Sequence, residues 1–295
     1  MSDSPGLEFR RALDNRPLPI VGVFNALTAK MAAAAGFRAV YQSGAALSAG
    51  LAAVPDIGLL TQTEFVRQGE YLARAVDVPV ISDADTGFGD VSSVERTVVL
   101  YESAGLAGLH LEDQQLPKRC GHLSGKTLVE TSEMVAKIKA AVSARRDSNF
   151  VIIARTDARG VVGIDEALDR AKAYVAAGAD MVFPEALQSA DEFVRFAEEI
   201  SVPLMANMTE FGKSPLLSVR ELGEMGFAAV LFPVTIFRVA MKAAEQALSK
   251  LADIGTQRDL LDDMQTRAEL YELLDYEAFK QGDREYFGTP GERGV

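Results

Sequence analysis

The stretch GLHLEDQQLPKRCGH, residues 108–122, joins a short apolar run to a dense group of reactive side chains. Residues 109–111 predict a buried strand, and the carboxylates of Glu112 and Asp113 follow where that strand should end. After Pro117 the chain places its only cysteine and one of its two histidines among cations: Lys118, Arg119, Cys120 and His122. We expect this strand end and its loop to carry the chemistry of the protein.

Cys120 is the first candidate for a reactive group. A thiol flanked by cations has surroundings that lower a thiol pKa, which makes it usable as an acid or a base. The alternative is an inert buried cysteine, the commoner fate of a single cysteine. Charged rather than apolar neighbours favour the reactive thiol.

The whole-chain numbers fit a globular protein with one large core. The chain has 295 residues, of which 48% are hydrophobic and 24% are charged. This length suits two average domains, or one α/β barrel of ~250 residues. We expect a single barrel domain over residues 1–295, in which 235–280 forms the eighth helix and a C-terminal helical extension.

Charge and cysteine content exclude several classes of partner. The net charge of −12 disfavours nucleic acids and anionic membranes. No apolar run reaches the ~18 residues of a membrane span, and the N-terminus lacks the apolar core of a signal peptide. A lone cysteine cannot build a disulfide framework and fits a reducing compartment, so we expect a cytoplasmic protein.

Eight apolar runs alternate with amphipathic helical segments along the chain. The runs, which predict strands, are residues 20–24, 39–43, 78–82, 109–111, 150–154, 181–183, 203–206 and 229–232. Several lack period-two alternation, as strands buried on both faces do. Four helical segments end in a glycine that suits the left-handed residue after a helix: Gly36, Gly105, Gly178 and Gly226.

This alternation predicts a (β/α)8 TIM-type barrel. The alternative is a doubly wound open sheet, which is disfavoured because eight regular units are many for it. The GFG segment at residues 87–89 lacks the G-x-G-x-x-G spacing, so no dinucleotide site is indicated.

Residues beyond the eighth strand exceed what a barrel needs. Residues 235–251 predict one long helix, and residues 259–280 predict another with an apolar stripe: Leu260, Leu261, Met264, Ala268, Tyr271 and Leu274. We expect the stripe to pack on a partner subunit. The alternative is a helix that folds back on its own barrel.

Carboxylates follow the third and fourth predicted strands, at the end where barrel enzymes place their sites. Asp83 and Asp85 are two residues apart, so both should face one side of a regular strand. With Glu112 they predict an all-oxygen site, which suits Mg²⁺ because waters and substrate complete its octahedron. Zinc is disfavoured, since Cys120 and His122 have no second pair of structural spacing. The alternative is that the aspartates cap the next helix.

Several motifs resemble the isocitrate lyase/phosphoenolpyruvate mutase superfamily: DADTGFG at residues 83–89, KRCGH at 118–122 and ARTD at 154–157. Others are similar to the 2-methylisocitrate lyase family within it: FPEA at 183–186, NMTEFG at 207–212 and MQTRAELY at 264–271. The KRCGH loop is specific to the lyases, because the phosphonate mutases lack its cysteine.

The resemblance implies cleavage of a tricarboxylate, 2-methylisocitrate, into pyruvate and succinate in the methylcitrate cycle of propionate catabolism. It implies Mg²⁺, with Mn²⁺ as a substitute, held by Asp83 and Asp85 partly through water. It also implies a homotetramer that exchanges C-terminal helices. The residues that would line the substrate are Ser43, Gly44, Ala45, Cys120, Gly121, Arg155, Glu185, Asn207, Met208, Thr209, Arg238 and Arg267.

The charge flow of this cleavage assigns further roles. It leaves a carbanion beside a carboxylate, which needs cations and donors at its oxygens and finally a proton. Cys120 is the expected proton donor, tuned by Lys118. The candidates to stabilise the charge are His122, Arg155, Asn207 and Thr209. The base that takes the hydroxyl proton stays open between three residues: Tyr41, Asp56 and Glu185.

Two other classes of function remain open. One is a different enzyme on the same scaffold, such as a lyase of isocitrate or 2,3-dimethylmalate, a phosphonate mutase or a keto-acid decarboxylase. The other is a barrel that binds small acids or serves as a scaffold without catalysis. The crowding of reactive groups at the strand ends disfavours the second class.

Overall fold

The computed structural model describes residues 3–15 and 17–287. The chain divides into two compact units that meet between Arg238 and Val239. The first unit carries the strands, and the second holds most of α10 (Thr235–Ile254) and the helices after it. Residues 1–2, 16 and 288–295 of the predicted domain lie outside the described residues.

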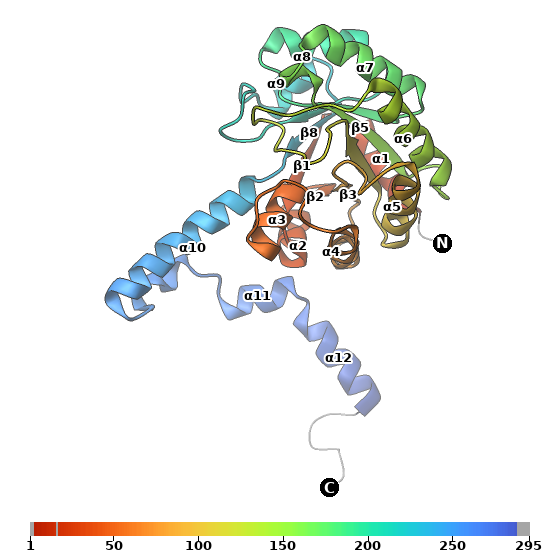
Figure 1. Cartoon of the computed structure of the whole chain (residues 1–295). Helices are drawn as coiled ribbons and strands as arrows, with labels where there is room; N and C mark the ends of the chain where they lie inside the picture. The colour runs from red at the N-terminus through yellow and green to blue at the C-terminus, as the bar shows by residue number, and fades with distance from the viewer. Residues whose placement is uncertain (1–2, 16, 288–295) are drawn as a thin grey trace. The chain divides into compact units, whose positions relative to one another are not determined.

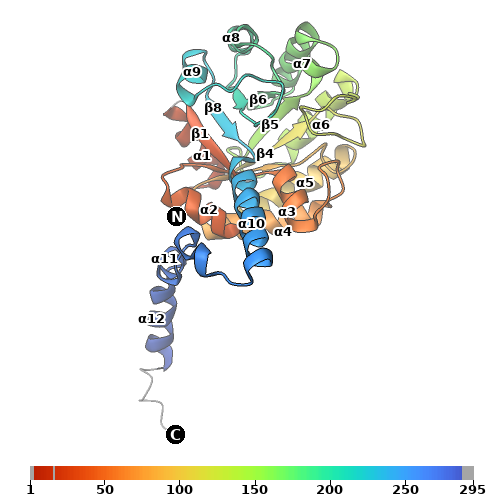
Figure 2. The same ribbon diagram turned by 90° about the vertical axis from the view of Figure 1, so that its left-hand side faces the viewer.

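In the described part of the first unit, eight parallel strands lie inside a layer of helices (Figures 1 and 2). Paired ladders join β1 through β6 in order, β7 to β8, and β8 to β1. A single parallel bridge between Val182 and Leu204 joins β6 to β7. The predicted (β/α)8 barrel is therefore confirmed, and the open sheet is wrong. The strands are β1 Leu18–Val23, β2 Val40–Gln42, β3 Val80–Asp83, β4 Gly108–Glu112, β5 Val151–Thr156, β6 Met181–Pro184, β7 Met205–Asn207 and β8 Ala229–Phe232.

Helices cover the strands, and local capping sets where several of them begin. Thr61 and Ser218 each form a capping box with a glutamate three residues later. The four glycines predicted to follow helices all have φ between 86° and 107°, as expected for a left-handed residue. The helices of this unit are α1 Pro5–Asp14, α2 Ala26–Ala34, α3 Gly44–Ala52, α4 Gln62–Ala75, α5 Val91–Ser103, α6 Thr131–Ala144, α7 Ile164–Ala176, α8 Ala190–Glu199 and α9 Val219–Glu224, with a 3-10 turn, η1, at Ala158–Gly160.

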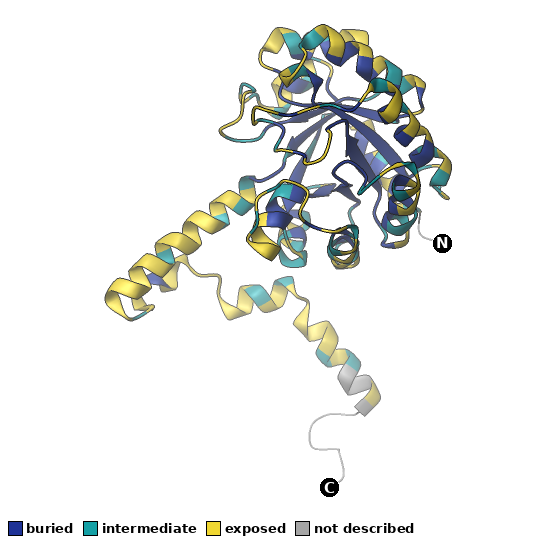
Figure 3. Ribbon diagram, in the orientation of Figure 1, coloured by how far each residue is buried: buried dark blue, intermediate teal, exposed yellow. Residues whose placement is uncertain are grey.

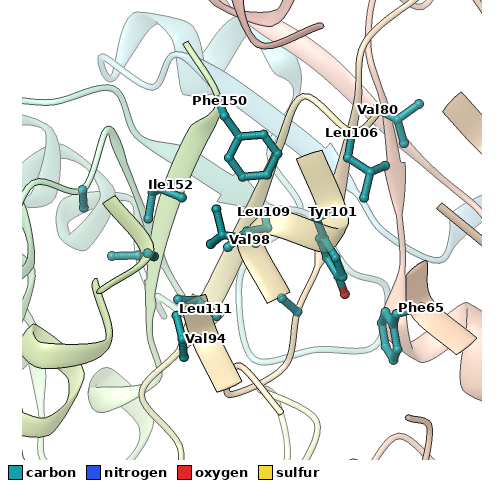
Figure 4. Close-up of a cluster of buried hydrophobic side chains, with 14 of the residues drawn as sticks. Phe65, Val80, Val94, Val98, Tyr101, Leu106, Leu109, Leu111, Phe150 and Ile152 are labelled. Carbon is teal, nitrogen blue, oxygen red and sulfur yellow. The ribbon is translucent and has the colours of Figure 1, made fainter. Parts of the chain in front are cut away.

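Most strand residues are buried, and most strands contribute to two of the apolar clusters (Figure 3). Leu109 and Leu111 of β4 pack outward against Val94, Val98 and Tyr101 of α5 (Figure 4). A second cluster contains Ile20, Ile81, Ile153, Phe183 and Leu231, whose side chains come from strands around the barrel. Burial on both faces explains why several strand sequences are continuously apolar.

The C-terminal unit corrects one predicted element. The single helix expected over residues 259–280 is a 3-10 helix, η2 (Arg258–Asp263), followed by α11 (Arg267–Leu273) and α12 (Tyr276–Phe287). Thr266 starts α11 with its own capping box, and Asp275 has a φ of 53°, which breaks the path into α12. The predicted stripe therefore spans several elements. Most of its members are exposed in this chain, whereas Leu260 is buried.

Among the described residues, none of the helices has the combination of length and apolar character that a membrane span requires.

Candidate active site

Strand periodicity places one layer of polar residues above the apolar interior of the barrel. Since Leu109 and Leu111 pack outward, the alternating residues of β4, His110 and Glu112, point inward. The same step of two leads from an apolar residue to a polar one on or just after β3, β5, β6 and β7: Ile81 to Asp83, Ile153 to Arg155, Phe183 to Glu185 and Met205 to Asn207. All these polar groups stand at the C-terminal end of the barrel.

A cavity of about 80 Å³ lies among these strand ends. The loop after β4 contributes Cys120, Gly121 and His122, and α10 contributes Arg238. The other predicted site residues that line it are Tyr41, Ser43, Ala45, Asp56, Asp83, Arg155, Glu185, Asn207 and Thr209. Segments far apart in the sequence therefore supply the walls of one small cavity.

Lys118 connects two carboxylates beside this cavity. Its Nζ lies 2.5 Å from Oδ1 of Asp85 and 2.5 Å from Oδ1 of Asp56, and its side chain is buried. Burial raises the pKa of Asp85 to about 7, although Lys118 acts in the opposite direction. Lys118, which we expected to tune the Cys120 thiol, therefore pairs with two aspartates instead.

The aspartate pair departs from the predicted arrangement. β3 ends at Asp83, and Asp85 has a φ of 46°, so the two side chains do not share the face of a regular strand. The capping alternative is also wrong, because Asp90 is the N-cap of α5. Among the described residues, no three Asp, Glu, His or Cys side chains are grouped closely enough to hold a metal ion as they stand.

Glu112 is the buried carboxylate of the site whose charge is least balanced by hydrogen-bond donors and cations. Its side chain is fully buried, and neither oxygen accepts a hydrogen bond from any described residue. The nearest cation is Nη1 of Arg155, 3.4 Å from Oε2. Burial raises the pKa of Glu112 well above its usual range, although Arg155 and Lys118 act in the opposite direction. Unpaired buried carboxylate oxygens are the donor set that a hard divalent cation prefers, so the residues present fit Mg²⁺.

Cys120 does not have the lowered pKa expected from its cationic neighbours. Burial raises the pKa of the Cys120 thiol, with a further contribution from Glu185. The neighbouring cations are engaged elsewhere: Lys118 with two aspartates, and Arg155 with Asp157. The thiol is therefore protonated at neutral pH, which is the form that can donate a proton.

Arg155 and Glu185 form the polar centre of the cavity. Asn207 Nδ2 donates to both oxygens of Glu185 at 3.2 Å, and His122 Nε2 lies 2.6 Å from Glu185 Oε1. Arg155 Nε lies 3.5 Å from Glu185 Oε2. Burial alone would raise the pKa of Glu185, but Arg155 and His122 outweigh it and lower this pKa.

Comparison with known proteins identifies the family. The family model for phosphoenolpyruvate phosphomutase matches residues 9–252. The 2-methylisocitrate lyase of Aeropyrum pernix is 49% identical over 96% of this chain and 91% of its own. The chain belongs to the phosphoenolpyruvate mutase/isocitrate lyase superfamily.

Solved structures of this superfamily share the whole fold. A 2,3-dimethylmalate lyase matches with a TM-score of 0.92 and 35% identity, covering 100% of this chain and 99% of that one. A phosphonopyruvate hydrolase in complex with oxalate and Mg²⁺ matches with a TM-score of 0.87 and 31% identity, covering 96% and 99%. The superfamily resemblance seen in the sequence motifs is confirmed.

Three residues expected to line the substrate, and the expected metal ligand Glu112, are absent from the residues that line this cavity. Gly44 lies behind the cavity wall against Asp83, where a Cβ would meet Oδ2 at 2.5 Å. Met208 is buried among apolar residues, and its sulfur accepts a hydrogen bond from the Leu217 N–H. Arg267 belongs to the C-terminal unit as the first residue of α11, so its part in binding stays a prediction. Glu112 lies behind Arg155 rather than in the cavity wall.

Sequence reasoning missed two buried residues that support the superfamily site, His110 and Lys126. His110 Nε2 lies 2.7 Å from the Tyr41 hydroxyl, and burial lowers the pKa of His110 to about 4, so its ring is neutral. Lys126 Nζ lies 2.7 Å from Oδ1 of Asp157. The inward step from Glu112 to His110 was a signal for the first of these, but nothing in the sequence pairs Lys126 with Asp157.

Proposed function

We propose that this protein is a Mg²⁺-dependent carbon–carbon lyase that cleaves 2-methylisocitrate into pyruvate and succinate. The observation that carries the proposal is a protonated thiol, Cys120, in one cavity with Arg155, Glu185 and Asn207. The similarity to the Aeropyrum pernix 2-methylisocitrate lyase over nearly the whole chain supports this substrate. The reaction would belong to the methylcitrate cycle of propionate catabolism, in the cytoplasm.

Asp83, Asp85 and Glu112 would hold the metal, partly through water, and Mn²⁺ would substitute for Mg²⁺. When bound, the cation would lower the cost of forming an alkoxide and would balance carboxylate charge. The excess of carboxylates over cations in the site supports this requirement. Among the described residues, five carboxylates pair with three cations, Lys118, Lys126 and Arg155: these are Asp56, Asp85, Glu112, Asp157 and Glu185, of which Glu185 also contacts His122.

The helix start at α3 offers a site for one substrate carboxylate. Ser43 caps α3, and the first N–H groups of this nine-residue helix, on Gly44 and Ala45, have no acceptor within the helix. Helix N-termini favour anions through these N–H groups. Arg155, with Thr209, Arg238 and Arg267, would receive the remaining charge.

Bond cleavage needs a base at one end of the substrate and an acid at the other. Among the described residues, Asp56 contacts only Lys118 through its carboxylate, whereas Glu185 is engaged by Asn207, His122 and Arg155. We therefore assign the base to Asp56 in preference to Glu185 or Tyr41. Cys120 then donates its proton to the carbanion of the departing succinate, while His122 and Arg155 stabilise the carboxylate beside it.

A substrate panel tests this function. Isocitrate, 2-methylisocitrate and 2,3-dimethylmalate are incubated with the protein and Mg²⁺, and pyruvate and glyoxylate are measured separately. Highest kcat/KM for 2-methylisocitrate, with pyruvate release, is the expected result. Preference for 2,3-dimethylmalate would instead support the activity of its structural neighbour. A barrel without catalysis would turn over none of the three.

The assembly is part of the same proposal. A homotetramer that exchanges C-terminal helices would cover the apolar side chains that are exposed in this chain, among them Leu248, Leu251, Leu261 and Phe279. It would also bring Arg267 of one subunit to a site in its neighbour.

A further inference from the structure

The chain on each side of Cys120 is held by a buried side chain from outside the cavity wall. Gln114 accepts a hydrogen bond from the Arg119 N–H at 2.8 Å and donates to the Arg119 carbonyl at 2.8 Å. Lys126 donates to the carbonyl of Gly121. The residues before and after the thiol are therefore both tied through their backbone.

Both holding residues are fixed themselves. The Gln114 residue is 1% exposed, and the Lys126 side chain is 1% exposed. Lys126 also pairs with Oδ1 of Asp157, at 2.7 Å, and Asp157 in turn receives two hydrogen bonds from Arg155. The Asp157 N–H donates to Asp113 at 2.8 Å. The loop is thus anchored to the end of β5, the strand that carries Arg155.

The loop packs so closely on the cavity residues that no side chain fits at Gly121. A Cβ at this position would lie 2.5 Å from Nη2 of Arg155 and 2.6 Å from Cδ of Glu185. The peptide next to the thiol therefore rests directly on the two central residues of the cavity. A buried ammonium on its carbonyl contributes a charge-assisted hydrogen bond, which is stronger than a neutral one.

We propose that Gln114 and Lys126 are positioning residues that clamp the backbone on both sides of Cys120 and so hold its thiol at the reacting carbon. The proposal rests on the assignment of Cys120 as the proton donor. A misplacement of about 1 Å in such a group costs on the order of 10²-fold in rate. Neither residue touches the cavity, so the loss should fall on kcat and leave KM little changed.

The test uses the fact that Cys120 is the only cysteine of the chain. The full-length protein and the variants Lys126→Met and Gln114→Met are alkylated with iodoacetamide, and the labelled fraction is followed by mass spectrometry. Rates are measured from pH 7 to 10 and fitted to a single ionisation, so that the limiting plateau rate of the fit reports access to the thiolate rather than its ionisation. Lys137→Met is the matched control, because Lys137 is also buried but hydrogen-bonds to Thr86 instead of the loop.

Both clamp variants should show a plateau labelling rate about tenfold or more above the parent, together with a kcat lowered on the order of 10²-fold. The control should keep the parental labelling rate. Gln114→Met removes an uncharged amide and leaves no buried charge unpaired, so this variant should fold even if Lys126→Met does not. A parental labelling rate in Gln114→Met would overturn the clamp. Faster labelling in a protein that cleaves none of the three substrates would leave the clamp standing and refute the proposed function.

Discussion

Cys120 combines partial burial with a raised pKa, and this combination defines what the side chain can do. A protonated thiol can deliver its proton to a carbanion, and burial keeps the thiol protonated until it reacts. The cations nearby serve other partners, so their proximity in sequence did not translate into a thiolate.

Cys120→Ser tests this role. An alcohol is a much weaker acid than a thiol, so kcat should fall by ~10² to 10⁴, which corresponds to roughly 3 to 5 kcal/mol of barrier. KM should change little, because the arginines and the helix start hold the substrate. Steady-state kinetics with 2-methylisocitrate give both constants. A serine variant with parental kcat would move the proton donor to His122 or to a bound water.

Asp85 tests the metal requirement at the level of one side chain. Asp85→Asn suits the positive φ of this position and leaves Lys118 paired with Asp56, so the fold should survive. Calorimetric titration should show weaker Mg²⁺ binding than in the parent, and turnover should need more Mg²⁺. In the parent, EDTA should abolish turnover and added Mg²⁺ or Mn²⁺ should restore it. Full activity of a rigorously metal-free parent would refute the metal site.

At the level of secondary-structure elements, the loop after β4 and the loop after β7 contact each other at His122. The segment between β7 and α9 places the Lys213 N–H 2.9 Å from Nδ1 of His122. Because Nδ1 accepts this hydrogen bond, a neutral ring carries its proton on Nε2, which faces Glu185. The loop after β7 therefore sets the orientation of a residue on the loop after β4.

Gly212→Ala tests this contact. A Cβ at Gly212 would lie 2.5 Å from Nδ1 of His122 and 2.8 Å from Cε1, so the ring must move away from Glu185. We expect kcat/KM to fall on the order of 10²-fold with a small change in thermal stability. Gly282→Ala is the control, since a Cβ there would have no neighbour within 4 Å among the described residues. Parental kinetics of Gly212→Ala would show that the ring position is not critical.

Element periodicity explains which parts of the site could be predicted from the sequence. The step of two along a strand carries Asp83, Glu112, Arg155 and Asn207 to one end of the barrel, and apolar runs reveal where the strands lie. Residues outside the regular strands could not be placed in this way. Asp85 lies in a turn, and the partner of Lys118, Asp56, is 62 residues away in the sequence.

Burial was the second quantity that the sequence did not reveal. The neighbours of Cys120 in the chain are charged, but its neighbours in space are a buried carboxylate and cations already paired, so burial decides its pKa. No local sequence pattern indicates that two residues as far apart in the chain as Lys126 and Asp157 form an ion pair. In the C-terminal unit, the apolar stripe was visible, whereas the capping box at Thr266 that divides it was overlooked.

At the scale of the whole molecule, we propose that the C-terminal unit packs on a neighbouring subunit of the same protein. Truncation after Gly255 removes η2, α11 and α12, and with them Arg267. We expect smaller, aggregation-prone species with little activity, as measured by light scattering after size-exclusion chromatography and by pyruvate release. Arg267→Met in the full-length chain is the control, because it should keep the assembly and weaken substrate binding. A monomeric and fully active truncation would contradict the exchange of helices.

The burial of Cys120 has a further consequence for the survival of the protein in a cell. Peroxides attack the thiolate, so a thiol that stays protonated is oxidised slowly. This chain contains no second cysteine that could rescue a sulfenic acid as a disulfide. The environment that keeps the proton on the sulfur therefore also shields an irreplaceable group from irreversible damage, without any repair chemistry of its own.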